Sequence, residues 1–318
     1  MSRIAKTVQA IVQPSLTAAA KQIRAGQRAV GSHIEPLAAA DHGATSAVQP
    51  QATGRSPSPH ATAAAEAAEK VGKWKNRVVL VAGANGNVGE QLVMRLAKKG
   101  VNLALAGRDG GPAIPLADLK AKVEKKGVKA AIFTPDLASA SEGHKLVNDA
   151  VKHFGRLDGV VDLVAIYHHG SFVEHSPAHW EKMIDLNLKG GTALMQEAAK
   201  KLSHSDMGFY GHASSLAGQA NIGNEIVYCQ TKAARRSLTL SFAAEVASGQ
   251  AKLPGPHTPA ITVVSPSLID SPMAEGRGFD LTRAIGSGDV ADAFMYQMGQ
   301  RGRTVTPEIT LSSRRSPY

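Results

Sequence analysis

A tyrosine and a lysine four residues apart, Tyr228 and Lys232, are the residues in this chain best suited to acid–base chemistry. On a helix this spacing places the two side chains one above the other on one face. A phenol has a pKa of about 10 and is a poor acid at neutral pH, but a nearby ammonium stabilises the phenolate and lowers that pKa. The pair is a candidate general acid/base for proton exchange with an alcohol or ketone, although the same spacing also arises on ordinary surface helices.

The composition is that of a soluble protein. A length of 318 residues allows one large domain or two small ones, and no apolar run approaches the roughly 18 residues of a membrane span. Cys229 is the single cysteine, so no intrachain disulfide can form, and we interpret it as a packed thiol. The net charge is +10, but the basic residues are spread along the chain without interleaved aromatics, which argues against a nucleic-acid partner.

Residues 1–72 differ from the rest of the chain. They are rich in Ala, Ser, Thr, Gln and Pro and contain no Phe, Trp or Tyr. An apolar stripe near the start, with Arg3 and Lys6 lying off it, resembles an organelle transit peptide. A disordered tail explains the composition equally well. We therefore expect an N-terminal extension, with the mitochondrial matrix or another organelle as the location if it is a transit peptide and the cytoplasm otherwise.

A strand, a glycine-rich loop and a helix follow one another at residues 77–98. This order is the context that a dinucleotide-binding turn requires. The glycines let the backbone approach a pyrophosphate, and the N-terminus of the helix favours its negative charge. The cofactor contacts predicted in this loop are Gly83, Asn85, Gly86, Asn87, Val88 and Gly89.

The second predicted strand, residues 101–106, ends at Gly107 and Arg108. The residue at this position faces the adenosine ribose in dinucleotide-binding folds, where an acid favours NAD and an arginine accommodates the 2′-phosphate of NADP. Arg108 therefore predicts NADP(H), with NAD(H) less favoured. The alternative is that Arg108 is a solvated turn residue.

Strands and helices alternate along the remainder of the chain. Helices are predicted at 116–126, 142–154, 177–202 and around Tyr228, and strands at 129–133, 157–166, 209–213 and 261–264. This alternation predicts an α/β fold with a doubly wound parallel sheet of the Rossmann type. We expect a single domain at residues 73–318 that carries both the cofactor and the substrate site.

Together these parts resemble the short-chain dehydrogenases/reductases, in their single-domain form. Ser215 precedes Tyr228 by thirteen residues, as the catalytic serine of that family precedes its tyrosine, and residues 185–190 are similar to the motif that carries its asparagine, here Asn187. Asp136 and Leu137 resemble the pair beside the adenine. Residues 265–273 resemble the loop at the nicotinamide, and the predicted contacts there are Pro266, Ile269 and Ser271.

The resemblance implies hydride transfer between the nicotinamide and a substrate carbon. Tyr228 would give or take the hydroxyl proton, and Ser215 would bind the substrate oxygen. Lys232 would lower the pKa of the tyrosine and bind the nicotinamide ribose, and Asn187 would hold a water that connects Lys232 to solvent.

The chain departs from the family pattern in several places. The glycine spacing is that of its extended or divergent branches. Asp162-Leu163-Val164-Ala165 stands where Asn-Asn-Ala-Gly is usual, Ser267 replaces a glycine, and the usual ending is blurred in residues 304–313. Because the fourth-strand residues normally brace the cofactor and the sheet, this departure favours an alternative function, a structural or assembly subunit that holds nucleotide with little turnover.

The remaining histidines and arginines near the site suggest no chemistry of their own. His168 and His169 are expected near the substrate mouth, and with His175 and His179 they form no familiar metal-ligand spacing, so no metal is predicted. Arg235 and Arg236, one turn after Lys232, are expected on a solvated or subunit-contact face.

The substrate is expected to be a small-molecule carbonyl or alcohol. The segments that would select it are 168–173, 218–227 and 274–287, and the last of these has few large apolar residues, which hints at a small or polar substrate. A homodimer or homotetramer is expected through the helices that carry Asn187 and Tyr228. Its physical basis is a set of apolar residues beyond those needed to cover the sheet, namely Leu194, Met195, Leu238, Leu240 and Phe242.

Overall fold

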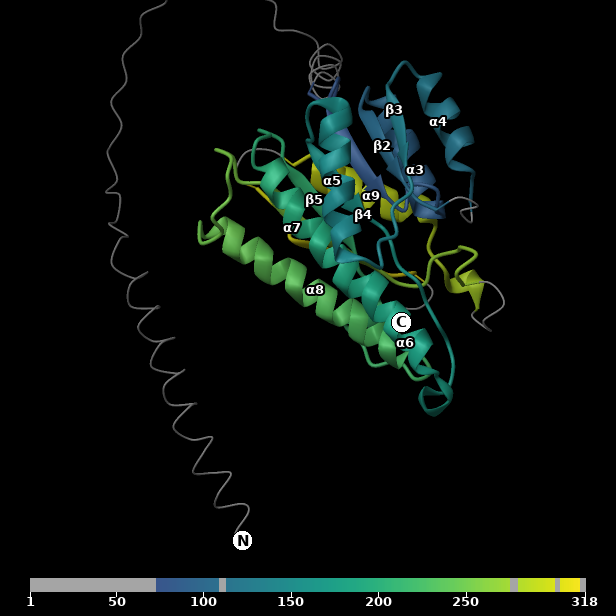
Figure 1. Ribbon diagram of the computed structural model, residues 1–318. Coiled ribbons are helices and arrows are strands. Elements are labelled where there is room, and N and C mark those ends of the chain that lie inside the picture. Colours follow the sequence, from purple (N-terminus) through teal and green to yellow (C-terminus); the bar gives the residue numbers. More distant parts are fainter. Residues whose placement is uncertain (1–72, 109–112, 275–279, 301–303, 315–318) are drawn as a thin grey trace, which may run out of the picture. The chain divides into compact units, whose positions relative to one another are not determined.

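The computed structural model describes residues 73–108, 113–274, 280–300 and 304–314 (Figure 1). The predictions made for residues 1–72 lie outside the described residues. No helix within the described ranges is long and apolar enough to cross a membrane.

Seven parallel strands form one sheet in the order β3-β2-β1-β4-β5-β6-β7. The strands are β1 (Val78–Ala82), β2 (Asn102–Ala106), β3 (Ala130–Phe133), β4 (Gly159–Asp162), β5 (Phe209–Ala213), β6 (Ala260–Pro266) and β7 (Glu308–Leu311). The order reverses between β1 and β4, and ligands of open α/β sheets bind at the carboxyl ends of the strands at such a point. The predicted α/β class and parallel sheet are confirmed.

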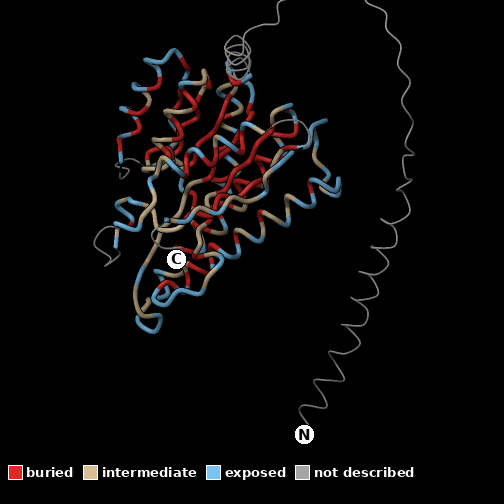
Figure 2. Tube along the Cα trace, turned by 180° about the vertical axis from the view of Figure 1, so that it is seen from behind, coloured by how far each residue is buried: buried red, intermediate tan, exposed pale blue. Residues whose placement is uncertain are grey.

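Helices cover both faces of the sheet (Figure 1). The helices are α3 (Asn87–Lys98), α4 (Leu116–Glu124), α5 (Ala140–Phe154), α6 (Pro177–Ile184), α7 (Gly191–Leu202), α8 (Ile226–Ala247) and α9 (Ser287–Met298). One buried cluster joins the sheet to α3, α4 and α9, and a second joins it to α5, α7 and α8. The red, buried segments of Figure 2 run through the strands between these two layers.

Strand ends align at one edge of the sheet. Ala82, the last residue of β1, pairs with Ala106 of β2 on one side and with Asp162 of β4 on the other. The glycine loop, Gly107 and the segment after Asp162 therefore leave the sheet at the same level. This register is what brings the predicted cofactor residues to one edge.

The long helix predicted at 177–202 is continuous but not uniform. A π-helical segment, η2 (Asp185–Gly190), separates α6 from α7 and carries Asn187. Such widened turns occur often at functional sites.

Three expectations were wrong. The fourth strand ends at Asp162 and not near residue 166, because the Asp162 carboxylate accepts a hydrogen bond from the Val164 backbone N–H at 3.1 Å and turns the chain. Leu194 and Met195 are buried in the core of the single chain and are not surplus apolar surface. Arg235 is 1% exposed and lies on no solvated face.

The segment 304–313, where the sequence does not match the usual ending of the family, contains a regular strand. β7 pairs with β6, with Glu308 opposite Val263 and Leu311 opposite Pro266. Arg236 is half-buried and donates a hydrogen bond from Nε to the Glu308 carboxylate at 2.6 Å, so it ties α8 to this last strand.

Candidate active site

The glycine loop makes a backbone turn that larger residues would block. Gly83 has a φ of +82°, in the left-handed region that favours glycine. A Cβ on Gly89 would lie 2.1 Å from the Gly83 carbonyl oxygen, so Gly89 allows α3 to approach the end of β1. No side chain caps the N-terminus of α3. Its first N–H groups therefore have no side-chain acceptor and could bind an anion.

Asn85 links this loop to the end of β2. Its side-chain Nδ2 donates to the Arg108 carbonyl oxygen at 2.8 Å, and a Cβ on Gly107 would lie 2.2 Å from its Oδ1. Gly107 is therefore needed to make room for the Asn85 amide. The side chain of Arg108 is exposed beside this contact, at the edge of the glycine loop.

Asp136 and Leu137 lie after β3 and outside the pocket described below. The exposed Asp136 carboxylate accepts from the Ala138 N–H at 3.1 Å. Leu137 is buried, and a Cβ on Gly190 would lie 1.6 Å from its carbonyl oxygen. The structure thus packs Leu137 against η2 and leaves the Asp136 side chain exposed.

Tyr228 and Lys232 lie on the first two turns of α8. Lys232 is 4% exposed, and its Nζ donates to the Ala213 carbonyl oxygen at 2.8 Å and lies 5.7 Å from the centre of the Tyr228 ring. Burial lowers the pKa of Lys232 to about 8, an effect that the Asp162 charge opposes and the Arg235 charge reinforces. Lys232 is therefore a cation at neutral pH with a proton that it can release.

Ser215 is the second residue after β5. Its Oγ accepts a hydrogen bond from the Ala217 N–H at 3.1 Å, which starts the short helix η3 (Leu216–Gly218). The neighbouring Ser214 is buried and donates to the Lys232 carbonyl oxygen at 3.2 Å. The end of β5 is thereby fixed against α8.

Asn187 fastens the chain after β4 to α8. Its amide accepts from the Ile166 N–H and donates to the Ile166 carbonyl oxygen, both at 2.8 Å, and also donates to Thr231 Oγ1 at 3.2 Å. Thr231 in turn donates to the Tyr228 carbonyl oxygen at 2.9 Å. The Asn187 side chain is engaged in these contacts and does not line the pocket.

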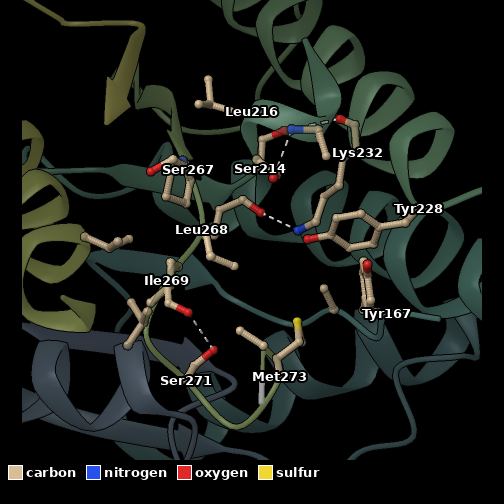
Figure 3. A pocket seen from close by; sticks show the side chains of 18 of the residues that line it. Tyr167, Ser214, Leu216, Tyr228, Lys232, Ser267, Leu268, Ile269, Ser271 and Met273 are labelled. Carbon is tan, nitrogen blue, oxygen red and sulfur yellow. Dashed lines mark hydrogen bonds between the residues drawn. The ribbon is translucent and has the colours of Figure 1, made fainter. Parts of the chain in front are cut away.

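The loop after β6 forms the wall opposite α8. Ser271 Oγ donates to the Ile269 carbonyl oxygen at 3.2 Å. The Oγ of Ser267, the residue that replaces a family glycine, is buried without a hydrogen-bond partner among the described residues, and Ser267 lines the pocket. Figure 3 shows Ile269 and Ser271 across the pocket from Tyr228 and Lys232.

These segments enclose a pocket of about 520 Å³. Most of the predicted site residues line it, namely Gly83, Gly86, Asn87, Val88, Gly89, Ser215, Tyr228, Lys232, Pro266, Ile269 and Ser271. Five predicted residues do not, namely Asn85, Arg108, Asp136, Leu137 and Asn187. The residues present fit a bound dinucleotide, because the uncapped helix, the glycine cradle and the unpartnered Ser267 hydroxyl all face one cavity.

Sequence reasoning missed several polar residues of the pocket, among them Tyr167 and Glu225. The Tyr167 hydroxyl donates to Glu225 Oε1 at 2.6 Å, and the Tyr167 ring packs edge-on against Tyr228 with 4.9 Å between centres (Figure 3). Glu225 lines the pocket although it is only 6% exposed. Its position three residues before Tyr228 was an available signal, since residues at i and i+3 share a helix face.

Part of the pocket wall is apolar. Side chains from the segment around η3 and from the loop after β6 form this part, namely Leu216, Ala217, Ala220, Ile222, Pro272 and Met273. Asp280 and Arg283 add charged groups at its margin.

The histidines gather beside this pocket and not in its wall. The His168 ring contacts those of His175 and His179, with ring centres 4.8 and 4.1 Å apart, and His169 stacks on Tyr167. Among the described residues, no group of three or more potential ligands has the geometry to hold a metal ion. Cys229 is buried, and burial raises the pKa of its thiol, as expected of a packed cysteine.

Comparison with known proteins gives an independent result. The family model described as short chain dehydrogenase matches residues 77–279. An uncharacterized oxidoreductase of Staphylococcus epidermidis is 26% identical over 239 residues, which cover 75% of this chain and 98% of the relative. A similar protein of Staphylococcus saprophyticus is 24% identical over 74% of this chain and 97% of its own length.

Solved structures share the fold. A short chain dehydrogenase from Burkholderia cenocepacia in complex with NADP has a TM-score of 0.66 at 21% identity, over 75% of this chain and 97% of that one. An alcohol dehydrogenase from Thermococcus sibiricus complexed with 5-hydroxy-NADP has a TM-score of 0.65 at 21% identity, over 76% and 97% of the two chains.

Proposed function

Because this chain belongs to the short-chain dehydrogenase family, we propose that it is an NADP(H)-dependent oxidoreductase that interconverts a carbonyl and an alcohol. The observation that carries the proposal is the composition of one pocket. Tyr228, Lys232 and Ser215 line it together with the uncapped N-terminus of α3. A proton donor and a dinucleotide cradle in the same cavity are what a hydride-transfer reaction needs.

The bound nicotinamide would supply or accept the hydride at a substrate carbon. In the reduction direction Tyr228 gives its hydroxyl proton to the substrate oxygen, and in the oxidation direction it takes that proton. Ser215 holds the same oxygen and stabilises its developing charge. Lys232, charged at neutral pH, favours the phenolate that Tyr228 becomes and binds the ribose.

The preference for NADP(H) over NAD(H) rests on Arg108. Its side chain is exposed beside the glycine loop while Asn85 fixes its backbone, and no acid stands in its place. The NADP complexes of the Burkholderia and Thermococcus proteins support the same choice. Asp136 and Leu137 would lie toward the adenine, and Pro266, Ile269 and Ser271 toward the nicotinamide.

The substrate is proposed to be a compact carbonyl compound with an apolar body. The apolar wall around Leu216, Ile222 and Met273 supports this class. Ile222 comes from the segment 218–227 that the sequence already marked as selective, and Leu216 and Met273 lie just outside the marked segments. Because this wall is apolar, the expectation of a small substrate is kept and that of a polar one is not.

A carbonyl-compound panel with NADPH oxidation followed at neutral pH tests the proposal, for the wild type and Tyr228→Phe together. The substitution keeps the ring and removes the hydroxyl, so NADPH binding should persist while turnover falls about 10²–10⁴-fold. If both proteins turn over equally, the assignment of Tyr228 is wrong. A wild type that binds NADPH and reduces nothing in a broad panel would instead support the alternative of a structural or assembly subunit.

A further inference from the structure

A buried ion pair lies directly beneath the catalytic helix. Arg235 NH2 donates to Asp162 Oδ2 at 2.9 Å, and the two side chains are 1% and 2% exposed. The same guanidinium donates to the Tyr210 hydroxyl, which lies 3.4 Å from Asp162 Oδ2. The contact joins α8 to β4 and β5. It takes the place of the Asn-Asn-Ala-Gly brace that the family resemblance led us to expect at the end of the fourth strand.

The surroundings are built for the guanidinium. A Cβ on Gly191, the first residue of α7, would lie 1.4 Å from Arg235 NH1, so glycine leaves the space that the charge occupies. An isolated buried charge is costly, and a paired one is tolerated when its hydrogen bonds are met. An arginine, an aspartate and a glycine from three separate elements thus depend on one another.

Asp162 connects the pair to the pocket. Its second oxygen, Oδ1, accepts from the Val164 N–H at 3.1 Å and so fixes the turn that carries Leu163. Leu163 lines the pocket, and a Cβ on Gly83 would lie 3.3 Å from it. Movement of Asp162 would therefore reach the cofactor side of the site.

Both members of the ion pair also act electrostatically on Lys232. Among the residues that the structure describes, no carboxylate forms an ion pair with Lys232. The Asp162 charge favours its ammonium form and the Arg235 charge disfavours it. Arg235 lies one turn from Lys232 on the same helix face, so the two cations share the single carboxylate of Asp162.

The other titratable groups near these cations stay neutral. Burial lowers the pKa of His212 on β5 well below its usual value, and Arg235 and Lys232 add to this. Burial raises the pKa of Tyr210 on the same strand. The neighbours from η2 and α8 include the uncharged side chains of Asn187 and Thr231, and the Tyr228 ring, whose centre lies 5.7 Å from Lys232 Nζ. Asp162 is thus the negative charge that stabilises the ammonium form of Lys232 against the repulsion from Arg235.

We propose that Asp162 and Arg235 act as a positioning pair that holds α8 on the end of β4 and sets the charge state of Lys232. The proposal rests on the proposed function for its consequence in catalysis, but its test does not require turnover. Removing either member should displace the titration of Lys232, and the two displacements should have opposite signs, because the partners carry opposite charges. A pair that served stability alone would not produce this opposition.

The experiment compares Asp162→Asn, Arg235→Met and the double variant, with Arg236→Met as the matched control on the next helix position. Lysine labelled with ¹³C at Cε is titrated by NMR, and the Lys232 resonance is assigned from its absence in Lys232→Arg. The pKa of Lys232 should fall by about 1 pH unit in Asp162→Asn and rise by about 1 pH unit in Arg235→Met. The double variant and Arg236→Met should titrate near the wild type.

Thermal unfolding gives a second readout. Asp162→Asn leaves a buried cation without a carboxylate and should melt about 10 °C below the wild type, and the double variant should regain most of that loss. If Asp162→Asn does not fold, Arg235→Met and the double variant still decide the result.

Shifts of the same sign, or no shift, in the two single variants would overturn the proposal. So would a control variant that shifts as much as Arg235→Met. Opposite shifts in a protein that reduces no carbonyl would refute the proposed function and keep the pair. An enzyme that reduces carbonyls but shows no opposite shifts of the Lys232 pKa would support the proposed function and refute the proposed role of the pair.

Discussion

The ammonium of Lys232 lies 5.7 Å from the centre of the Tyr228 ring and is almost completely buried. Burial keeps the pKa of Lys232 at about 8 in the folded chain, against 10.5 for an exposed lysine. The folded state therefore disfavours the charge at neutral pH. We therefore expect the buried Lys232 to lower the free energy of unfolding, and we attribute its presence to its role in acid–base chemistry.

The first prediction is that Lys232→Met stabilises the fold and abolishes activity. At pH 7 the lowered pKa costs about 3 kcal/mol, and loss of the hydrogen bond to Ala213 returns about 1 kcal/mol, so the unfolding free energy should rise by about 2 kcal/mol. Denaturant unfolding measures this difference, and NADPH oxidation should fall at least about 10²-fold.

The sign of the pH dependence provides the control for this prediction. Between pH 8 and 10.5 the folded wild type releases the Lys232 proton before the unfolded chain does, so its stability should rise with pH across this window. Lys232→Met should lack that rise. Parallel stability curves for the two proteins would contradict the assigned burial penalty.

The second prediction concerns cofactor choice at Arg108. A charge-assisted contact with the 2′-phosphate contributes about 1.5–3 kcal/mol, so Arg108→Ala should reduce the preference for NADPH over NADH by about tenfold or more. Fluorescence titration with both cofactors measures the ratio. Lys120, a partly exposed lysine on α4, offers Lys120→Ala as a control that should leave the ratio unchanged. Equal dissociation constants of NADPH and NADH in the wild type would contradict the role assigned to Arg108.

The third prediction is that residues 1–72 are dispensable for the fold. Their composition cannot bury a core, whereas every strand of the described sheet begins after Trp74. A chain that starts at Gly72 should melt cooperatively at about the temperature of the full chain, as followed by circular dichroism. An insoluble product, or a much lower melting temperature, would show that the extension packs on the domain.

The fourth prediction is a homodimer or homotetramer through the helical segment that carries Asn187, which comprises α6, η2 and α7, and through α8. Leu194 and Met195 no longer support it, but Leu240 remains half-buried on α8, and Ala234 is exposed on the same helix. Ala234→Glu should convert the oligomer to a monomer in light scattering. Ala121→Glu, at an exposed alanine of α4, should not. A dilute wild-type monomer would be evidence against this interface.

Local signals in the sequence were sufficient to predict the glycine loop and the Tyr228–Lys232 pair, the two halves of the candidate site. Gly83, Gly86 and Gly89 follow a buried strand and precede a helix, and the spacing of Tyr228 and Lys232 fixes their shared face, so both features depend on neighbouring residues alone. The alternation of strands and helices likewise determined the parallel sheet. Its seventh strand was missed because Glu308–Leu311 is short and only half-buried.

Tertiary structure decided what surrounds those residues. The sequence places Arg235 one turn after Lys232 but cannot say whether that face meets water or the sheet. The answer lies in Asp162, 73 residues earlier in the chain, whose carboxylate meets the guanidinium, and in Gly191, which leaves it space. The same holds for Tyr167 and Glu225, 58 residues apart. Contacts between residues so distant in the chain depend on how the elements pack, and no local pattern of residue types encodes them.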